Sequence, residues 1–306
     1  MAALTAIELA IWLYAWSVGV APAPMTATYV AFAFVALGIA LGLRPLWRRG
    51  EPRASLPAML LGAVIVGVNT SLFMALKFAI PAFLPFWLDT PLAAAEARLF
   101  GTDPYQLLDS LLGRTTLVVD RIYGFWLPVQ LVVLFSLLAA PASRAKSRAL
   151  TAYAAAWFLI GIVGAALLSS AGPIFFDRVV GGARFAPLHQ MLEAHGAWMV
   201  LSTSETIWSA YASGQYRLVA GISAAPSMHV AISLWMLLVA RDLAPRAVPL
   251  AAAYLAFIWI ASVQLGWHYA SDGLVGIAGV MALWWLAGRL ITRPRPHSPP
   301  GSARAP

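Results

Sequence analysis

Residues 248–290 read VPLAAAYLAFIWIASVQLGWHYASDGLVGIAGVMALWWLAGRL, in which two apolar runs are separated by a short polar stretch. Each run approaches the ~20 residues that an α-helix needs to cross a bilayer. A backbone in lipid must satisfy its own hydrogen bonds, so both runs are expected to be helices rather than isolated strands. The polar stretch from Gly266 to Asp272 is therefore expected at a membrane surface.

The composition of the whole chain also excludes a water-soluble domain. Of its 306 residues, 61% belong to the set AVILMFWYC and 10% are charged, whereas about 25% are charged in a typical soluble domain. This number of charged groups is too small to cover the surface of a protein of this size in water. The chain has no cysteine, which excludes disulfide scaffolds, thiol catalysis and thiolate metal sites. We therefore expect an integral membrane protein built from helices.

The apolar segments predict an all-α bundle with about eight transmembrane helices. They cover residues 6–21, 27–43, 57–80, 115–140, 149–170, 228–243, 248–267 and 271–290. The first segment contains Glu8 and follows no basic residue, so we expect it to be retained rather than cleaved as a signal peptide. We divide the chain into an N-terminal transmembrane pair with a basic loop (1–56), a membrane domain that carries the polar motifs (57–291) and a disordered basic, proline-rich tail (292–306).

The basic residues predict the orientation of this bundle. With eight spans, 13 of the 20 Lys and Arg residues fall on the side shared by both termini, and such an excess marks the cytoplasmic side. These residues are Arg44, Arg48, Arg49, Arg53, Arg144, Lys146, Arg148, Arg241, Arg246, Arg289, Arg293, Arg295 and Arg304. We expect a bacterial inner-membrane protein with cytoplasmic N- and C-termini.

Two long segments are expected on the opposite, extracytoplasmic side. Residues 81–114 place charged residues and Trp87 among leucine and phenylalanine at helical spacing, which predicts an amphipathic helix on the outer leaflet. Residues 171–227 are too long for a plain connection and contain a helical pattern over about 189–211. We expect this second segment to carry structure or function of its own.

Two short polar sequences interrupt membrane segments on this same side. Gly221-Ile-Ser-Ala-Ala-Pro-Ser-Met-His229 opens the sixth span, and Gly266-Trp-His-Tyr-Ala-Ser-Asp272 joins the seventh span to the eighth. In the first sequence Ser227 is a preferred N-cap, so the helix that follows offers free backbone N–H groups and a positive dipole end to an anion. His229 lies in the same turn.

The second sequence adds a histidine that is backed by a carboxylate. On a helix, His268 and Asp272 are neighbours on one face. A carboxylate that accepts from one ring nitrogen fixes the tautomer and leaves the other nitrogen as a nucleophile or base. Each feature alone also fits a structural role, as an interfacial histidine, a helix cap or a hydrogen-bonded pair. Together they favour phosphoryl-transfer chemistry, because ionisable residues in membrane segments are costly and usually functional.

These motifs resemble those of the type 2 phosphatidic acid phosphatase superfamily, and most closely its branch of inositol phosphorylceramide synthases. That branch reads Pro-Ser-(Leu/Met)-His, then Leu-Gly-x-His-Tyr-x-x-Asp with small residues following. The matching positions are Pro226, Ser227, Met228, His229, Leu265, Gly266, His268, Tyr269, Asp272, Gly273 and Gly276. The resemblance covers about residues 150–290 and, more weakly, 81–140, and it implies a six-helix core.

The resemblance also implies roles for individual side chains. His268 would attack phosphorus and form a phosphohistidine, and Asp272 would orient it. His229 would protonate the leaving oxygen, and Ser227 would help to hold the phosphate. No metal or other cofactor is implied.

The basic residues that could bind the phosphate differ from those of the better-known branch of the superfamily. That branch has a Lys-x6-Arg-Pro signature upstream and an arginine six residues before the second histidine, where this chain has Ser262. Lys77 has part of the upstream spacing but lacks the arginine and comes two spans too early, so we treat it as coincidence. Arg178 is the first candidate for the phosphate cation and Arg217 is the second, although either arginine also fits a lipid-headgroup contact.

The sequence therefore predicts a metal-independent membrane enzyme that transfers or hydrolyses a phosphoryl group on a lipid phosphate or phospholipid. A transferase would need an alcohol or inositol-type acceptor. A plain phosphatidate or polyprenyl phosphate phosphatase is one alternative. A transporter or scaffold without catalysis is another, in which the histidines and the aspartate are structural. The net charge of +8 is explained by its distribution along the bundle, so no nucleic-acid partner is expected.

Overall fold

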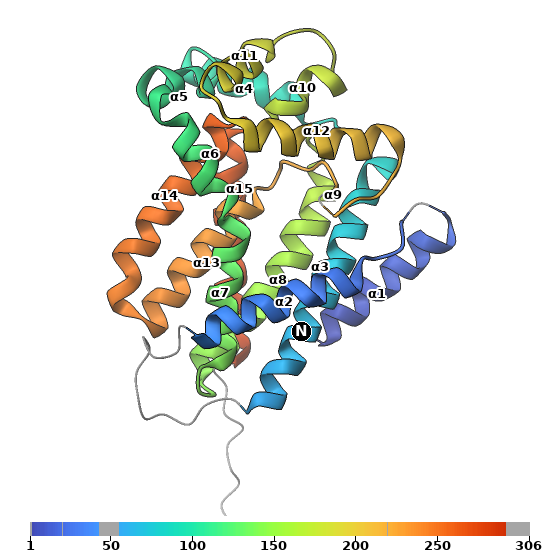
Figure 1. The fold of residues 1–306 in the computed structure, drawn as a ribbon, viewed down its shortest axis with the longest axis vertical. Coiled ribbons are helices and arrows are strands. Elements are labelled where there is room, and N and C mark those ends of the chain that lie inside the picture. Colours follow the sequence, from blue (N-terminus) through green and yellow to red (C-terminus); the bar gives the residue numbers. More distant parts are fainter. Residues whose placement is uncertain (1, 20, 43–54, 219, 292–306) are drawn as a thin grey trace, which may run out of the picture.

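The protein is a bundle of helices with a cap of shorter helices at one end (Figure 1). The computed structural model describes residues 2–19, 21–42, 55–218 and 220–291, and these ranges contain helices and no strand. In chain order the elements are α1 (Ala2–Ser17), α2 (Thr26–Gly42), α3 (Leu56–Phe83), α4 (Asp89–Phe100), α5 (Pro104–Leu112), η2 (Gly113–Thr115), α6 (Thr116–Gly124), α7 (Trp126–Ala139), α8 (Arg144–Phe158), η3 (Leu159–Gly164), α9 (Ala165–Leu167), α10 (Pro173–Val179), α11 (Ala186–Ala194), α12 (Trp198–Ser213), α13 (Met228–Leu243), η4 (Pro245–Ala247), α14 (Val248–Gln264) and α15 (Ala270–Ile291).

The expected all-α membrane architecture is confirmed. Among the described residues, five helical runs are long and apolar enough to cross a bilayer. They are Leu56–Phe83, Pro104–Ala139, Arg144–Leu167, Pro245–Gln264 and Ala270–Ile291. The other three expected spans correspond to α1, α2 and α13, which have 16, 17 and 16 residues. The count of eight spans and the six-helix core therefore stay predictions.

The helix α13 forms the centre of the bundle. Eleven of its 16 residues are buried, and Trp235 donates from Nε1 to the carbonyl oxygen of Ala149 in α8 at 2.8 Å. Just beyond α8, the π-helical turn η3 packs against the residues before α13. The contact is close, since a Cβ added at Gly164 would lie 3.2 Å from the ring of Pro226. This packing holds the start of α13, and with it the first polar motif, inside the protein.

The cap consists of α4, α5, α10, α11 and α12 (Figure 1). Of these, α4 and α5 take the place of the single outer helix expected over 81–114. The expected helix is divided because Gly101 ends α4 with φ 77° and Pro104 begins α5. Its acidic residues also differ from an amphipathic arrangement, since Asp89 and Glu96 are buried while Leu99 is 77% exposed. In the second outer segment, the helical stretch expected over about 189–211 forms two helices, α11 and α12, which are separated at residues 195–197.

The other end of the bundle carries the described basic residues of the predicted cytoplasmic side. Arg148, near the start of α8, lies 3.7 Å from Asp242 and donates from Nε to the carbonyl oxygen of Trp284 at 3.0 Å. Arg289 lies in the last turn of α15. The basic loop 43–54 and the tail 292–306 lie outside the described residues. The orientation in the membrane stays a prediction.

Candidate active site

Two histidines from separate motifs meet at the capped end of the bundle. His229 lies in the first turn of α13, and His268 lies between α14 and α15. The Nδ1 atom of His229 is 3.2 Å from the Nε2 atom of His268, and the ring centroids are 5.3 Å apart. The structure thus brings together the two imidazoles that the motif analysis singles out.

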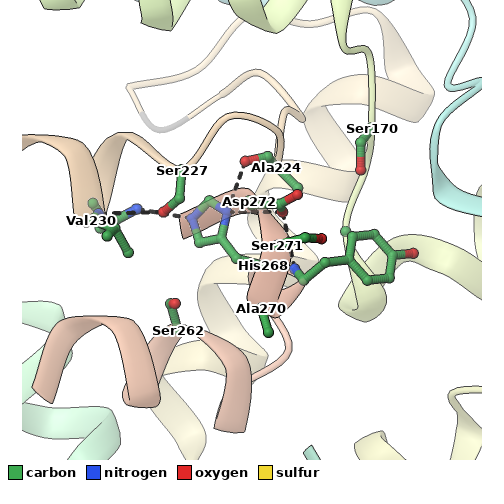
Figure 2. Close-up of polar contacts among 12 residues, drawn as sticks. Ser170, Ala224, Ser227, Val230, Ser262, His268, Ala270, Ser271 and Asp272 are labelled. Carbon is green, nitrogen blue, oxygen red and sulfur yellow. Dashed lines mark hydrogen bonds and ion pairs between the residues drawn. The ribbon is translucent and has the colours of Figure 1, made fainter. Parts of the chain in front are cut away.

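The second ring nitrogen of His268 is held by the main chain. Its Nδ1 atom is 2.8 Å from the carbonyl oxygen of Ala224 and 3.5 Å from Oδ2 of Asp272 (Figure 2). A carbonyl oxygen only accepts, so Nδ1 of His268 carries the proton. Its Nε2 atom is then the basic nitrogen and accepts from Nδ1 of His229. The expected carboxylate is present, but the shorter contact that fixes the tautomer is with Ala224.

The starts of α13 and α15 contact each other through their backbones. The N–H group of Ser227 donates to the carbonyl oxygen of Asp272 at 3.1 Å. A Cβ at Gly276 would lie 2.6 Å from the carbonyl oxygen of Ser227, so this close approach requires glycine. Ser227 is the N-cap of α13 and accepts from the N–H group of Val230 at 3.4 Å (Figure 2). These contacts fix the spacing between the two motifs.

Aromatic side chains from the run Pro104–Ala139 enclose His229. The ring of Tyr123 stacks on it at a centroid distance of 4.9 Å, and the ring of Trp126 lies at 4.3 Å. Trp126 also donates from Nε1 to the carbonyl oxygen of His229 at 3.1 Å. These rings restrict the orientation of the imidazole. Sequence reasoning misses Trp126 because tryptophan is common as an anchor in membrane proteins.

A second buried carboxylate, that of Asp89, connects the cap to the residue after His268. Asp89 has no exposed surface. It accepts from Ser170 Oγ at 3.0 Å, from the N–H groups of Ala171 and Gly172 at 2.7 and 2.9 Å, and from the Tyr269 hydroxyl at 3.1 Å. Burial raises the pKa of the Asp89 carboxyl, and its hydrogen bonds lower that pKa in part. The sequence offers no signal for this contact, because Asp89 and Tyr269 are 180 residues apart.

Glu96 supports the start of α15 in a similar way. Its Oε1 atom accepts from the N–H group and from Oγ of Ser271 at 2.7 and 2.6 Å. A carboxylate at a helix N-terminus interacts favourably with the helix dipole and satisfies N–H groups that lack a partner within the helix. Asp89 and Glu96 of α4 therefore both bind residues that directly follow His268, namely Tyr269 and Ser271.

The remaining candidate residues lie farther out or have other partners. Arg178 pairs with Glu205 at 2.6 Å and lies over the ring of Trp208 at 5.2 Å. Arg217 is exposed between α12 and α13. Ser262 is buried and donates from Oγ to the carbonyl oxygen of Trp259 in its own helix at 2.7 Å. In this structure neither arginine is shown in contact with the two histidines.

Comparison with known protein families gives one result. Residues 90–286 match the family model of the PAP2 superfamily. The chain belongs to the PAP2 superfamily. This membership confirms the resemblance at the level of the superfamily and indicates a lipid phosphatase-type activity on lipid phosphates in a membrane. No curated protein and no solved structure matches the chain. The matched residues of this PAP2 protein begin in α4 and leave out α1, α2 and α3.

Proposed function

We propose that this PAP2 protein is a lipid phosphatase or phosphotransferase in which His268 is the nucleophile. Nε2 of His268 attacks the phosphorus of a lipid phosphate or phosphodiester headgroup, the bond from phosphorus to the leaving oxygen breaks, and His229 gives that oxygen its proton. An acceptor hydroxyl then attacks the phosphohistidine, the N–P bond breaks, and the acceptor proton passes to His229. Asp272 and the carbonyl oxygen of Ala224 stabilise the imidazole of His268 through Nδ1.

The observation that supports this proposal most directly is the contact between the two imidazoles. A nucleophile and a general acid must lie on either side of the transferred phosphorus. Reacting atoms approach to about 3–3.5 Å, so a phosphoryl group does not fit between nitrogens that are 3.2 Å apart. The rings of His229 and His268 must therefore separate when the substrate enters. Their hydrogen bond is a resting contact that the phosphate replaces.

The phosphate oxygens also need donors beside the two histidines. The start of α13 offers backbone N–H groups and a positive dipole end to an anion. Ser227 at this helix start, together with Arg178 and Arg217, stays a proposed phosphate ligand. Arg178 would have to exchange its partner Glu205 for the substrate, because the two side chains are paired at 2.6 Å.

The acceptor distinguishes a phosphatase from a phosphotransferase. Water gives free phosphate, and a lipid alcohol or inositol-type acceptor gives a new phosphoester. The motif resemblance favours transfer, and membership in the PAP2 superfamily fits hydrolysis equally well. Both reactions share the first step at His268, so a test of that step comes first.

The test compares His268→Ala with His189→Ala in purified protein in detergent. His189 lies in α11, where its Nε2 atom is 3.0 Å from the carbonyl oxygen of Ile174, and it has no proposed role. Each variant receives short-chain phosphatidate or polyprenyl phosphate, with and without candidate alcohols, and both free phosphate and new phosphoesters are quantified. Thermal unfolding checks that each variant is folded.

We expect His268→Ala to lose turnover by at least ~10³-fold while it stays folded, because the nucleophile is removed. His189→Ala should keep the turnover of the wild type. A labelled lipid phosphate should leave an acid-labile label on the wild type and none on His268→Ala. If folded His268→Ala turns over as fast as the wild type, or if the wild type turns over no lipid phosphate at all, the enzyme proposal is wrong and the transporter or scaffold alternative is favoured.

A further inference from the structure

A single lysine in the N-terminal part of the bundle packs against the segment that leads to the first histidine motif. Lys77 is the only charged residue of the long apolar helix α3. About six residues separate it from Phe83 at the end of that helix, which corresponds to about 9 Å along the axis. A charge at this depth is costly in a membrane helix, and such charges usually face a polar interior and serve a function.

The stem of the Lys77 side chain packs against the segment that leads to the first motif. If Gly221 carried a Cβ atom, that atom would lie 3.0 Å from Cγ of Lys77 and 3.0 Å from the backbone nitrogen of Phe78, so the backbone at Gly221 lies directly against α3. The same segment is held against α3 by the rings of Phe78 and Tyr216, whose centroids are 5.5 Å apart. Three residues after Gly221, the carbonyl oxygen of Ala224 holds His268. Lys77 therefore contacts the backbone segment that supports the nucleophile.

The same face of α3 also approaches the second histidine. Phe73 lies one turn before Lys77 on α3. A Cβ added at Gly161 would lie 2.7 Å from the ring of Phe73 and 3.3 Å from the sulfur of Met228, so Phe73 and Met228 both pack against Gly161. Met228 precedes His229, and the charge of Lys77 interacts electrostatically with the His229 imidazole. Lys77 and His229 both keep part of their surface accessible although they lie within the bundle. These two side chains are therefore both partly accessible and lie within electrostatic range of each other.

Lys77 has no internal counter-charge that would explain it as a structural residue. Among the residues that the structure describes, it forms neither an ion pair nor a hydrogen bond. An ammonium group in such a place is normally paired or neutralised, because removal from water is expensive. The positive charge of Lys77, within electrostatic range of His229, is thus available to an anion.

We propose that Lys77 binds the substrate phosphate, so that α3 completes a site whose other residues come from the part of the chain matched to the PAP2 superfamily. This inference rests on the proposed function, because the anion is the phosphate that His268 attacks. It assigns a phosphate-binding residue to a helix that precedes the matched residues 90–286. The ammonium group would bind a phosphate oxygen through a charge-assisted hydrogen bond.

The experiment measures the binding of inorganic phosphate, as a competitive inhibitor of lipid phosphate turnover and as a stabiliser of the folded protein. It compares Lys77→Met and Lys77→Arg with Lys146→Met. Lys146 donates from Nζ to the carbonyl oxygens of Leu138 and Ala140 at 2.7 and 2.6 Å, and it lies at the basic end of the bundle, away from the site. His268→Ala is included in the stabilisation assay, where no turnover is needed.

We expect Lys77→Met to weaken phosphate binding by at least about 10-fold and to raise KM for the lipid phosphate, because a charge-assisted hydrogen bond is lost. Lys77→Arg should keep part of the affinity, and Lys146→Met should bind phosphate like the wild type. Phosphate should raise the thermal midpoint of the wild type and of His268→Ala but not that of Lys77→Met. Without phosphate, Lys77→Met should be as stable as the wild type or more stable, because an unpaired charge is removed.

Two results would overturn the inference and leave the proposed function intact. One is normal phosphate affinity in folded Lys77→Met while His268→Ala loses turnover. The other is a combination of two findings: Lys77→Met loses much of its stability without phosphate, and phosphate affinity is unchanged in Lys77→Arg and in the fraction of Lys77→Met that stays folded. This combination would show that the lysine has a structural role. Normal turnover in His268→Ala would instead reject the proposed function.

Discussion

The hydrogen bond between Tyr269 and Asp89 offers a quantitative test of how the cap supports the proposed nucleophile, His268. Tyr269 follows His268 in the chain, and its hydroxyl donates to Oδ1 of Asp89 at 3.1 Å in a fully buried place. Burial raises the pKa of the Tyr269 hydroxyl, so this group stays a donor at neutral pH. The perturbation is a double-mutant cycle of Tyr269→Phe and Asp89→Ala, with unfolding followed in detergent.

The magnitude follows from the hydrogen bonds that each variant removes. Tyr269→Phe removes one of the four bonds to Asp89, which we expect to cost about 1–3 kcal/mol. Asp89→Ala leaves four buried donors without an acceptor and should cost more than 3 kcal/mol, because each unpaired group costs about 1–3 kcal/mol. The double variant should be less destabilised than the sum, by a coupling of about 1–3 kcal/mol.

The control pair is Asp89→Ala with Tyr153→Phe. The Tyr153 hydroxyl donates to Gln130 at 2.9 Å in the middle of the bundle, so it loses a buried hydrogen bond of the same kind without contact to Asp89. Its effect should add to that of Asp89→Ala within about 0.5 kcal/mol. A coupling below ~0.5 kcal/mol between Tyr269 and Asp89 would refute the role given to this contact. Equal couplings in both pairs would show that Asp89→Ala disturbs the whole fold.

Two further predictions concern contacts around the site. Gly172 has φ 90°, and a Cβ there would lie 2.6 Å from the carbonyl oxygen of Trp267. Gly172→Ala should therefore lower the thermal midpoint and the turnover clearly more than Gly181→Ala, because Gly181 has a similar φ of 93° but no atom within 4 Å of its Cβ position. Equal effects of the two substitutions would contradict the steric argument. Trp126→Phe removes the hydrogen bond to the backbone of His229, the proposed acid, and should cost about 0.5–1.5 kcal/mol of stability and part of kcat. Trp284→Phe, whose Nε1 has no partner in the described residues, should cost less, and the reverse order would reject the support assigned to the Trp126 indole.

The sequence predicts the fold class and the local structure of the two polar motifs because both depend on local patterns. Apolar runs of helix length require helices in lipid. The spacing of His268 and Asp272 places them near each other within one turn, and the structure has Nδ1 of His268 3.5 Å from Oδ2 of Asp272. A helix start at Ser227 follows from its preference for the N-cap position. Each of these statements needs only a few neighbouring residues.

The parts that sequence reasoning misses depend on contacts between distant segments. Asp89 is read as the polar face of a surface helix, although in the folded chain it binds a loop and a tyrosine far along the sequence. The tautomer of His268 is fixed mainly by a backbone carbonyl, and main-chain acceptors leave no trace in a motif. Lys77 is treated as coincidence because its signature is incomplete and comes two spans too early, yet the fold packs α3 against Gly221 of the segment before α13.

The direct contact between the backbones of Ser227 and Gly276 has a consequence for how this enzyme is able to diversify. Peptide groups, rather than exchangeable side chains, set the geometry that the reaction needs. Side chains around this contact are then open to change during evolution, with the backbone geometry of the candidate site preserved. New lipid preferences are accessible by a few substitutions, without any redesign of the chemistry beneath them.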